Sequence, residues 1–110
     1  MNAREDKVYL EDILDSIEII FQHINNLTEF EFSKNILVQD AVIRRFEILG
    51  EAASKISPEF KTLHPEIEWK LMKEMRNKLS HEYFGVVTET IYKTVKRDLP
   101  LLKEKIAALI

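Results

Sequence analysis

Four long stretches of this sequence repeat their apolar residues at three- and four-residue steps, with little to interrupt them. The clearest stretch runs from about residue 4 to 26, where isoleucines and leucines would form one stripe along a helix. Only 2 glycines and 3 prolines occur among the 110 residues, too few turn residues for a β fold with many turns. The pattern therefore predicts an all-α protein built from long amphipathic helices.

The expected helices, one of them a single short turn, are 4–26, 36–56, 58–63, 67–84 and 88–109. We expect residues 28–35 to form a connection that tucks Phe30 and Phe32 under the bundle. Pro100 should kink or split the last helix, because proline removes a helical hydrogen bond and clashes with the preceding turn. Short connections favour antiparallel neighbours, so we predict an up-and-down bundle that forms one domain over residues 1–110.

Two local signals refine this picture of the second half of the bundle. Gly50 lies inside the second long helix, where glycine costs roughly 1 kcal/mol relative to alanine. We expect it to permit a close helix crossing, with Ser54 one turn further on. Ser57 followed by Pro58 offers an N-cap with proline at the first helical position, which predicts that the short turn of helix begins there.

Composition limits the kinds of function that the chain can have. It contains no cysteine, which excludes disulfides, thiolate zinc sites and a cysteine nucleophile. The first helix is interrupted by acidic residues, so we expect neither a signal peptide nor a membrane span, and a cytoplasmic location. The net charge is −3 and the pI is near 5.6, whereas nucleic-acid binders are usually basic. Contact with RNA would therefore require a local basic site.

Residues 76–83 hold the main candidates for function and read Arg-Asn-Lys-Leu-Ser-His-Glu-Tyr. Arg76 can hold a phosphate with its rigid fork of donors, and His81 can transfer protons near neutral pH. Asn77 lies four residues before His81, so the two are neighbours on a helix surface. Asn77 could therefore orient the imidazole or bind a substrate oxygen. Together these residues suggest chemistry or recognition at a phosphodiester.

The helical repeat places these candidates on one polar arc of the third long helix, opposite an apolar arc. The members of the polar arc are Lys70, Lys73, Arg76, Asn77, Ser80 and His81. Wheel geometry alone favours the simpler interpretation, a solvated face of an amphipathic helix. No two histidines stand at a ligand spacing such as i, i+4, so we expect no metal site.

The motif and its surroundings resemble the HEPN ribonucleases, and in particular the HepT-type toxins. Arg76, Asn77, His81 and Tyr83 match the family's arginine, polar residue, histidine and tyrosine, with the same four-residue spacer. The resemblance covers essentially the whole chain and implies a HEPN-like helical bundle. The flanking segments that are also similar are 49–53, 57–60, 64–69 and 83–86.

The resemblance implies a metal-independent endoribonuclease that needs no cofactor. A ribose 2′-hydroxyl would attack the adjacent phosphorus, leaving a 2′,3′-cyclic phosphate and a 5′-hydroxyl. His81 would act as general base or acid, Arg76 would stabilise the phosphate charge, and Asn77 would assist. One histidine per chain is few for a reaction that needs both a base and an acid. The family is accordingly homodimeric, with two motif helices across one cleft and further assembly left open.

The resemblance also implies a partner, the minimal nucleotidyltransferase antitoxin of a type VII toxin–antitoxin system. That enzyme would transfer AMP to Tyr83 and place negative phosphate where RNA should bind. An alternative is that the chain is a non-catalytic binding partner, or substrate-presenting subunit, of a nucleotidyltransferase. A purely structural dimer module is a third interpretation, and it would make the motif accidental.

Further residues are expected to support the site. Lys70, Lys73 and Ser80 share the polar arc and are expected to contact RNA. Glu47 and Glu51 belong to a charged stripe on the second long helix. The stripe is most simply a salt-bridged, solvated face. The sharper hypothesis is that Glu47 or Glu51 orients Arg76 without itself touching the substrate.

Overall fold

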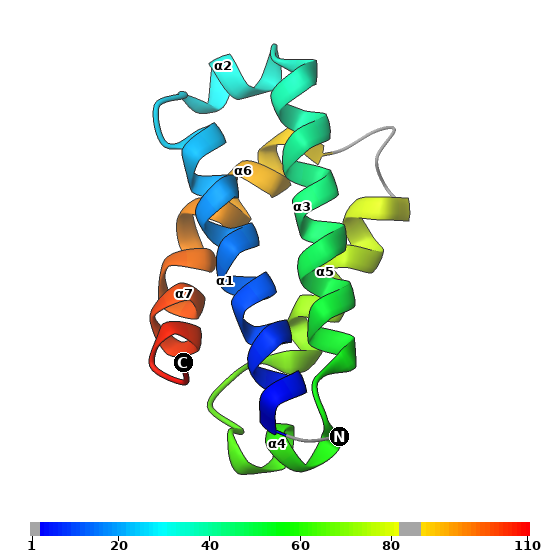
Figure 1. The fold of residues 1–110 in the computed structure, drawn as a ribbon. Helices are drawn as coiled ribbons and strands as arrows, with labels where there is room; N and C mark the ends of the chain where they lie inside the picture. The colour runs from blue at the N-terminus through cyan, green and yellow to red at the C-terminus, as the bar shows by residue number, and fades with distance from the viewer. Residues whose placement is uncertain (1–2, 82–86) are drawn as a thin grey trace.

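The computed structural model describes residues 3–81 and 87–110, and every element within them is helical. The expected all-α bundle is therefore confirmed (Figure 1). The helices are α1 (Ala3–Ile24), α2 (Glu29–Ser33), α3 (Ile36–Lys55), α4 (Pro58–Leu63), α5 (Trp69–His81), α6 (Val87–Arg97) and α7 (Leu99–Ala107).

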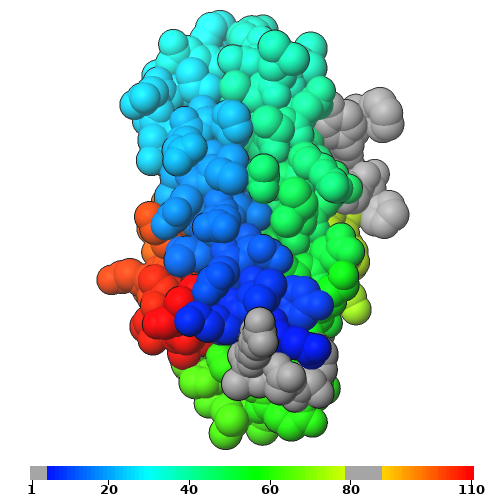
Figure 2. All heavy atoms as spheres, in the orientation of Figure 1, coloured from blue at the N-terminus to red at the C-terminus, as the bar shows by residue number. Residues whose placement is uncertain are grey.

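The long helices run up and down, and α3 lies between α1 and α5 (Figure 1). Helix α7 packs against α1, and α2 packs against α6 at the end of the bundle away from both termini. In the same orientation, side chains of α1 and α3 cover one face of the molecule, with those of α4 below them (Figure 2). Within the described residues, no helix is long and apolar enough to cross a membrane.

The core is formed by the apolar stripes that the sequence repeat predicts. Helix α1 turns a column of fully buried isoleucines inward, and α3 meets it with Phe46 and Leu49 at 0% exposure. Helices α6 and α7 close the other side of the same cluster. The largest fully buried side chains are Phe32, Phe46, Leu10, Ile13, Ile17, Ile20, Ile24, Leu49, Met72, Ile91, Leu99 and Ile106.

Residues 28–35 differ from the expected connection, because they contain a short helix, α2. Thr28 begins it with a capping box, in which its hydroxyl accepts from the Glu31 N–H while the Glu31 carboxylate accepts from the Thr28 N–H. Phe32 is fully buried as predicted, and its ring lies 6.0 Å from that of Tyr92. Phe30 is 70% exposed, so the expectation that it tucks under the bundle is wrong.

Helix α4 begins where the sequence predicts, with Ser57 as its N-cap. The Ser57 hydroxyl accepts a hydrogen bond from the Phe60 N–H at 3.2 Å and itself donates to Asp6 of α1. Pro100 splits the last predicted helix as expected. Helix α6 ends at Arg97, and Pro100 lies in the first turn of α7, where its missing N–H leaves no hydrogen bond unmade.

Candidate functional site

Helix α5 carries the motif, and its first turn is anchored by aromatic contacts. The Trp69 indole N–H donates to the His64 carbonyl oxygen at 3.0 Å, and its ring meets that of Phe60 edge to face at 6.1 Å. Ile67, just before the helix, is 2% exposed. These contacts hold the first turn of α5 against α4 and its C-cap residue His64.

The described part of α5 divides into the two arcs that the sequence predicts. Met72 and Met75 are buried, whereas Lys70 and Lys73 are exposed and Arg76 and Asn77 are half-buried. The backbone of α5 continues to His81. The predicted roles of the Ser80 and His81 side chains, and of Tyr83, lie outside what the structure describes. Arg76 and Asn77 are therefore the candidate residues whose geometry can be followed in detail.

Arg76 lies where α5 crosses α3, and Gly50 is the residue that it crosses. A β-carbon placed on Gly50 would lie 2.5 Å from the Cβ of Arg76 and about 3 Å from its Cδ and Cγ (3.0 and 3.1 Å). Real β-carbons essentially never approach other atoms at 2.5 Å, so any side chain at residue 50 would push the helices apart. The close crossing expected at Gly50 is confirmed, and the sequence did not indicate that its partner is Arg76.

The guanidinium of Arg76 is held by its neighbour Asn77. The Arg76 Nε and Nη2 atoms both donate to the Asn77 Oδ1, at 3.3 and 3.1 Å. The four-residue spacing predicts that Asn77 orients the imidazole of His81 or binds a substrate oxygen, and this role stays a prediction. The structure shows that the amide oxygen of Asn77 accepts two donors from one edge of the arginine. This contact between adjacent residues carries no periodic signal, so sequence spacing alone could not reveal it.

The charged residues around the motif form local pairs. Glu51 of α3 pairs with Lys55 one turn further on at 3.5 Å, and Lys70 of α5 lies 4.0 Å from Glu74. Both pairs are exposed, so each adds only a few tenths of a kcal/mol. Glu47 is half-buried on the same face of α3 as Glu51. A role for Glu47 or Glu51 behind Arg76 stays a prediction.

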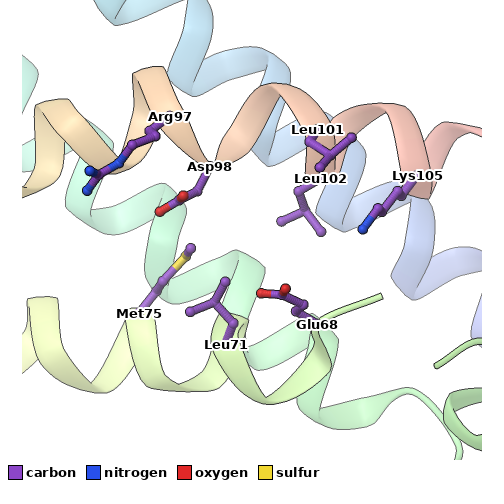
Figure 3. A pocket seen from close by; sticks show the side chains of 8 residues that line it. All are labelled: Glu68, Leu71, Met75, Arg97, Asp98, Leu101, Leu102 and Lys105. Carbon is purple, nitrogen blue, oxygen red and sulfur yellow. The ribbon is translucent and has the colours of Figure 1, made fainter. Parts of the chain in front are cut away.

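A small pocket opens on another side of α5, against α6 and α7 (Figure 3). Apolar side chains from α5 and α7 line it together with charged groups of both signs. Arg76 and Asn77 are not among its lining residues, so the pocket is separate from the candidate site. The residues that line it are Glu68, Leu71, Met75, Arg97, Asp98, Leu101, Leu102 and Lys105.

The chemistry of the site follows from its donor groups. Within residues 3–81 and 87–110, no three His, Cys, Asp or Glu side chains come together in a way that could hold a metal ion. His64, which stacks on Phe60 at 4.4 Å and contacts Glu66 at 3.3 Å, belongs to the anchor of α5. The described site thus consists of a clamped arginine with exposed lysines on the same helix, which suits an anionic ligand.

Comparison with known proteins identifies the class to which this fold and site belong. The family described as ribonuclease HepT-like matches residues 13–109. A Thermococcus cleftensis protein named probable ribonuclease HepT is 48% identical over 102 residues, which cover 93% of each chain. A Methanocaldococcus jannaschii protein named as an RNase is 37% identical over 106 residues, 96% of this chain and 97% of that relative. No solved structure gave a significant match.

The same archaeon has another relative, whose name joins a gamma-glutamylcyclotransferase to an RNase. It is 44% identical over 103 residues, which cover 94% of this chain and 46% of that relative. The chain therefore belongs to the ribonuclease HepT-like family. The expected resemblance is confirmed, and so is the expected enzyme class, a ribonuclease.

Proposed function

We propose that the protein is a metal-independent endoribonuclease whose chemistry is carried by Arg76 and His81 of α5. The observation that carries this proposal is the clamped arginine. Arg76 crosses α3 at Gly50, is held by Asn77, and precedes His81 by five residues on one helix, in a chain of the ribonuclease HepT-like family. A guanidinium fixed in this way suits a phosphate, whose charge it can balance as the reaction proceeds.

In the proposed reaction, the ribose 2′-oxygen attacks the adjacent phosphorus and the bond from phosphorus to the 5′-oxygen breaks. A base removes the proton of the 2′-hydroxyl, and an acid gives a proton to the leaving 5′-oxygen. The products are a 2′,3′-cyclic phosphate and a 5′-hydroxyl, so no external reactant is needed. His81 can take either role, because imidazole titrates near neutral pH.

One imidazole on each motif helix favours a homodimer as the working form. Base and acid must act within one turnover, and a two-fold axis beside α5 would bring a second His81 to the same cleft. Lys70 and Lys73 are exposed on the same helix and would hold the RNA backbone on either side of the reacting phosphate. Ser80 would join them, and Glu47 or Glu51 would support Arg76 from α3.

Control of this activity would act on Tyr83, two residues after His81. We propose that a minimal nucleotidyltransferase antitoxin transfers AMP to the phenol oxygen of Tyr83 and releases pyrophosphate from ATP. The added phosphodiester would bring negative charge beside Arg76 and His81 and would repel RNA. Such a pair forms a type VII toxin–antitoxin system in the cytoplasm, with this chain as the toxin.

The test is cleavage of total RNA by the purified protein in EDTA, beside His81→Ala. Intact mass first establishes that Tyr83 carries no AMP. We expect cleavage that survives EDTA, is lost in the variant, and leaves 2′,3′-cyclic phosphate ends. Absence of cleavage by the unmodified wild type would refute the catalytic proposal. It would favour the alternative, in which the chain is a non-catalytic partner that presents substrate to a nucleotidyltransferase.

A further inference from the structure

The contacts that hold the Arg76 side chain determine which edge of its guanidinium can meet a substrate. An arginine has five N–H donors, distributed over Nε, Nη1 and Nη2. The Nε donor and one Nη2 donor point to the Asn77 Oδ1, at 3.3 and 3.1 Å. These two donors form the side edge of the fork. The donors that Asn77 does not use are both hydrogens of Nη1 and the second hydrogen of Nη2. One hydrogen from each of these two nitrogens forms the terminal edge, and the other Nη1 hydrogen points back toward Cδ.

Gly50 determines the position of the Arg76 side chain against α3. The Arg76 Cβ, Cγ and Cδ lie so close to α3 that a β-carbon on Gly50 would be 2.5, 3.1 and 3.0 Å from them. The aliphatic stem therefore runs along the α3 backbone at Gly50, and α3 and α5 come close together where the arginine leaves its helix. The Cβ of Arg76 is attached directly to the α5 backbone and cannot rotate away. A methyl group at residue 50 would therefore displace α5 itself.

From these two contacts we infer that Gly50 and Asn77 are positioning residues, which present the terminal Nη1–Nη2 edge of Arg76 to the reacting phosphate. The inference rests on the proposed ribonuclease function and deepens it. Asn77 then need not touch the substrate. It acts through Arg76, and its neutral amide holds the guanidinium without cancelling the positive charge that the phosphate requires.

The chemistry of the clamp explains why an amide suits this position. An aspartate at residue 77 would hold the same edge of Arg76 more tightly, as a bidentate ion pair. It would also place a negative charge beside the phosphate site and weaken phosphate binding. An alanine would release the guanidinium, which would then sample several rotamers. The two substitutions therefore distinguish the effect of misplacing the guanidinium from the effect of adding a negative charge beside it.

The experiment compares Gly50→Ala, Asn77→Ala and Asn77→Asp with wild type on one RNA oligomer that wild type cleaves. Steady-state kinetics give kcat and KM, and thermal unfolding gives the Tm. Anisotropy with a fluorescent 2′-O-methyl RNA of the same sequence gives the Kd, because this RNA lacks the attacking hydroxyl. Two controls are matched to Gly50→Ala. Ser54→Ala changes an exposed residue of α3 one turn away, and Ile106→Val loosens the core in α7.

We expect Gly50→Ala and Asn77→Ala to lose about tenfold to a hundredfold in kcat/KM, since a misplacement of about 1 Å can cost that much. Asn77→Asp should weaken binding of the 2′-O-methyl RNA more than Asn77→Ala does. Ser54→Ala and Ile106→Val should keep wild-type kcat/KM, although Ile106→Val should lower the Tm. Should Gly50→Ala fail to fold, the two Asn77 variants carry the test, because residue 77 is only half-buried.

A purely structural role would give another result. The variants would then lower the Tm as Ile106→Val does, and the folded protein would keep kcat/KM within about twofold of wild type. That outcome would overturn the inference and leave the ribonuclease proposal standing. Failure of wild type itself to cleave RNA, by contrast, refutes the proposed function. Equal Kd values for Asn77→Asp and Asn77→Ala would refute the assigned role of the neutral amide.

Discussion

The carboxylate of Asp6 accepts two hydrogen bonds from Ser57, one from its backbone N–H at 2.8 Å and one from its hydroxyl at 2.7 Å. Both residues are 3% exposed, and they lie 51 positions apart in the chain. The contact joins the first turns of α1 to the N-cap of α4. Because α5 follows α4 after only a short connection, residues 64–68, the contact helps to fix the end of the bundle from which the motif helix starts.

Asp6→Ala should destabilise the fold, because it leaves two buried donors of Ser57 without this acceptor. The expected loss is about 1–3 kcal/mol in the free energy of unfolding, measured by urea denaturation. Asp6→Asn keeps one acceptor oxygen, so its free energy of unfolding should lie between those of Asp6→Ala and wild type. A loss below about 0.5 kcal/mol, which is typical of a surface substitution, would contradict the assigned role of the contact.

The two phenylalanines of α2 provide a matched pair for a second prediction. Phe32→Ala should cost about 3–5 kcal/mol, because it empties a fully buried position beside Tyr92. Phe30→Ala should change stability by no more than about 0.5 kcal/mol, because its side chain is 70% exposed. Thermal or urea unfolding measures both. Equal losses would mean that α2 is packed differently from the arrangement seen here.

The contrast between these two residues also illustrates what the sequence can predict. Long helices, the split near Pro100 and the N-cap at Ser57 follow from local patterns, and the structure confirms them. Helix α2 is too short to show a period, so the sequence pattern predicts a connection over residues 28–35. The capping box of Thr28 and Glu31 was the available signal. Without a period, the pattern could not distinguish the buried ring of Phe32 from the exposed ring of Phe30.

For the candidate site, the sequence predicts the helix that carries it, the polar arc of that helix, and that Arg76 and Asn77 belong to the site. It cannot predict contacts that depend on how two helices approach each other. The crossing of Arg76 over Gly50 joins residues from α5 and α3, and the bond between Asp6 and Ser57 joins α1 to α4. Each depends on the packing of the whole bundle. The clamp by Asn77 depends on a side-chain rotamer, which no spacing rule fixes.

The exposed lysines of α5 lead to a third prediction, which rests on the proposed function. If Lys73 contacts the RNA backbone, Lys73→Ala should reduce the slope of log Kd against log salt concentration by about 0.7, the value for one phosphate contact on a single strand. The measurement is anisotropy with 2′-O-methyl RNA at several salt concentrations. Lys55→Ala is the control, because Lys55 pairs with Glu51 on α3. Equal slopes for Lys73→Ala and wild type would remove Lys73 from the RNA surface.

Helix α6 contains an ion pair with a measurable pH signature. A hydrogen bond and the charge of Lys93 lower the pKa of Glu89 below its usual 4.5. The small stabilisation from this pair is therefore present above pH 4.5 and is lost as the pH falls through the lowered pKa. Carboxyl NMR titration of Glu89 should show the lowered value, and Lys93→Ala should raise it. High salt should reduce the shift, because both groups are exposed.

Mixed dimers test whether two His81 side chains serve one cleft. Wild type and His81→Ala are unfolded together, refolded in equal amounts and assayed for RNA cleavage. If each cleft needs both imidazoles, only dimers with two wild-type chains cleave, and activity falls to about a quarter of the all-wild-type value. If each chain acts at a site of its own and needs only its own imidazole, activity falls to about a half. Ser54→Ala replaces His81→Ala in the control mixture and should leave full activity. A result of one half would refute the shared cleft while keeping His81 in its catalytic role.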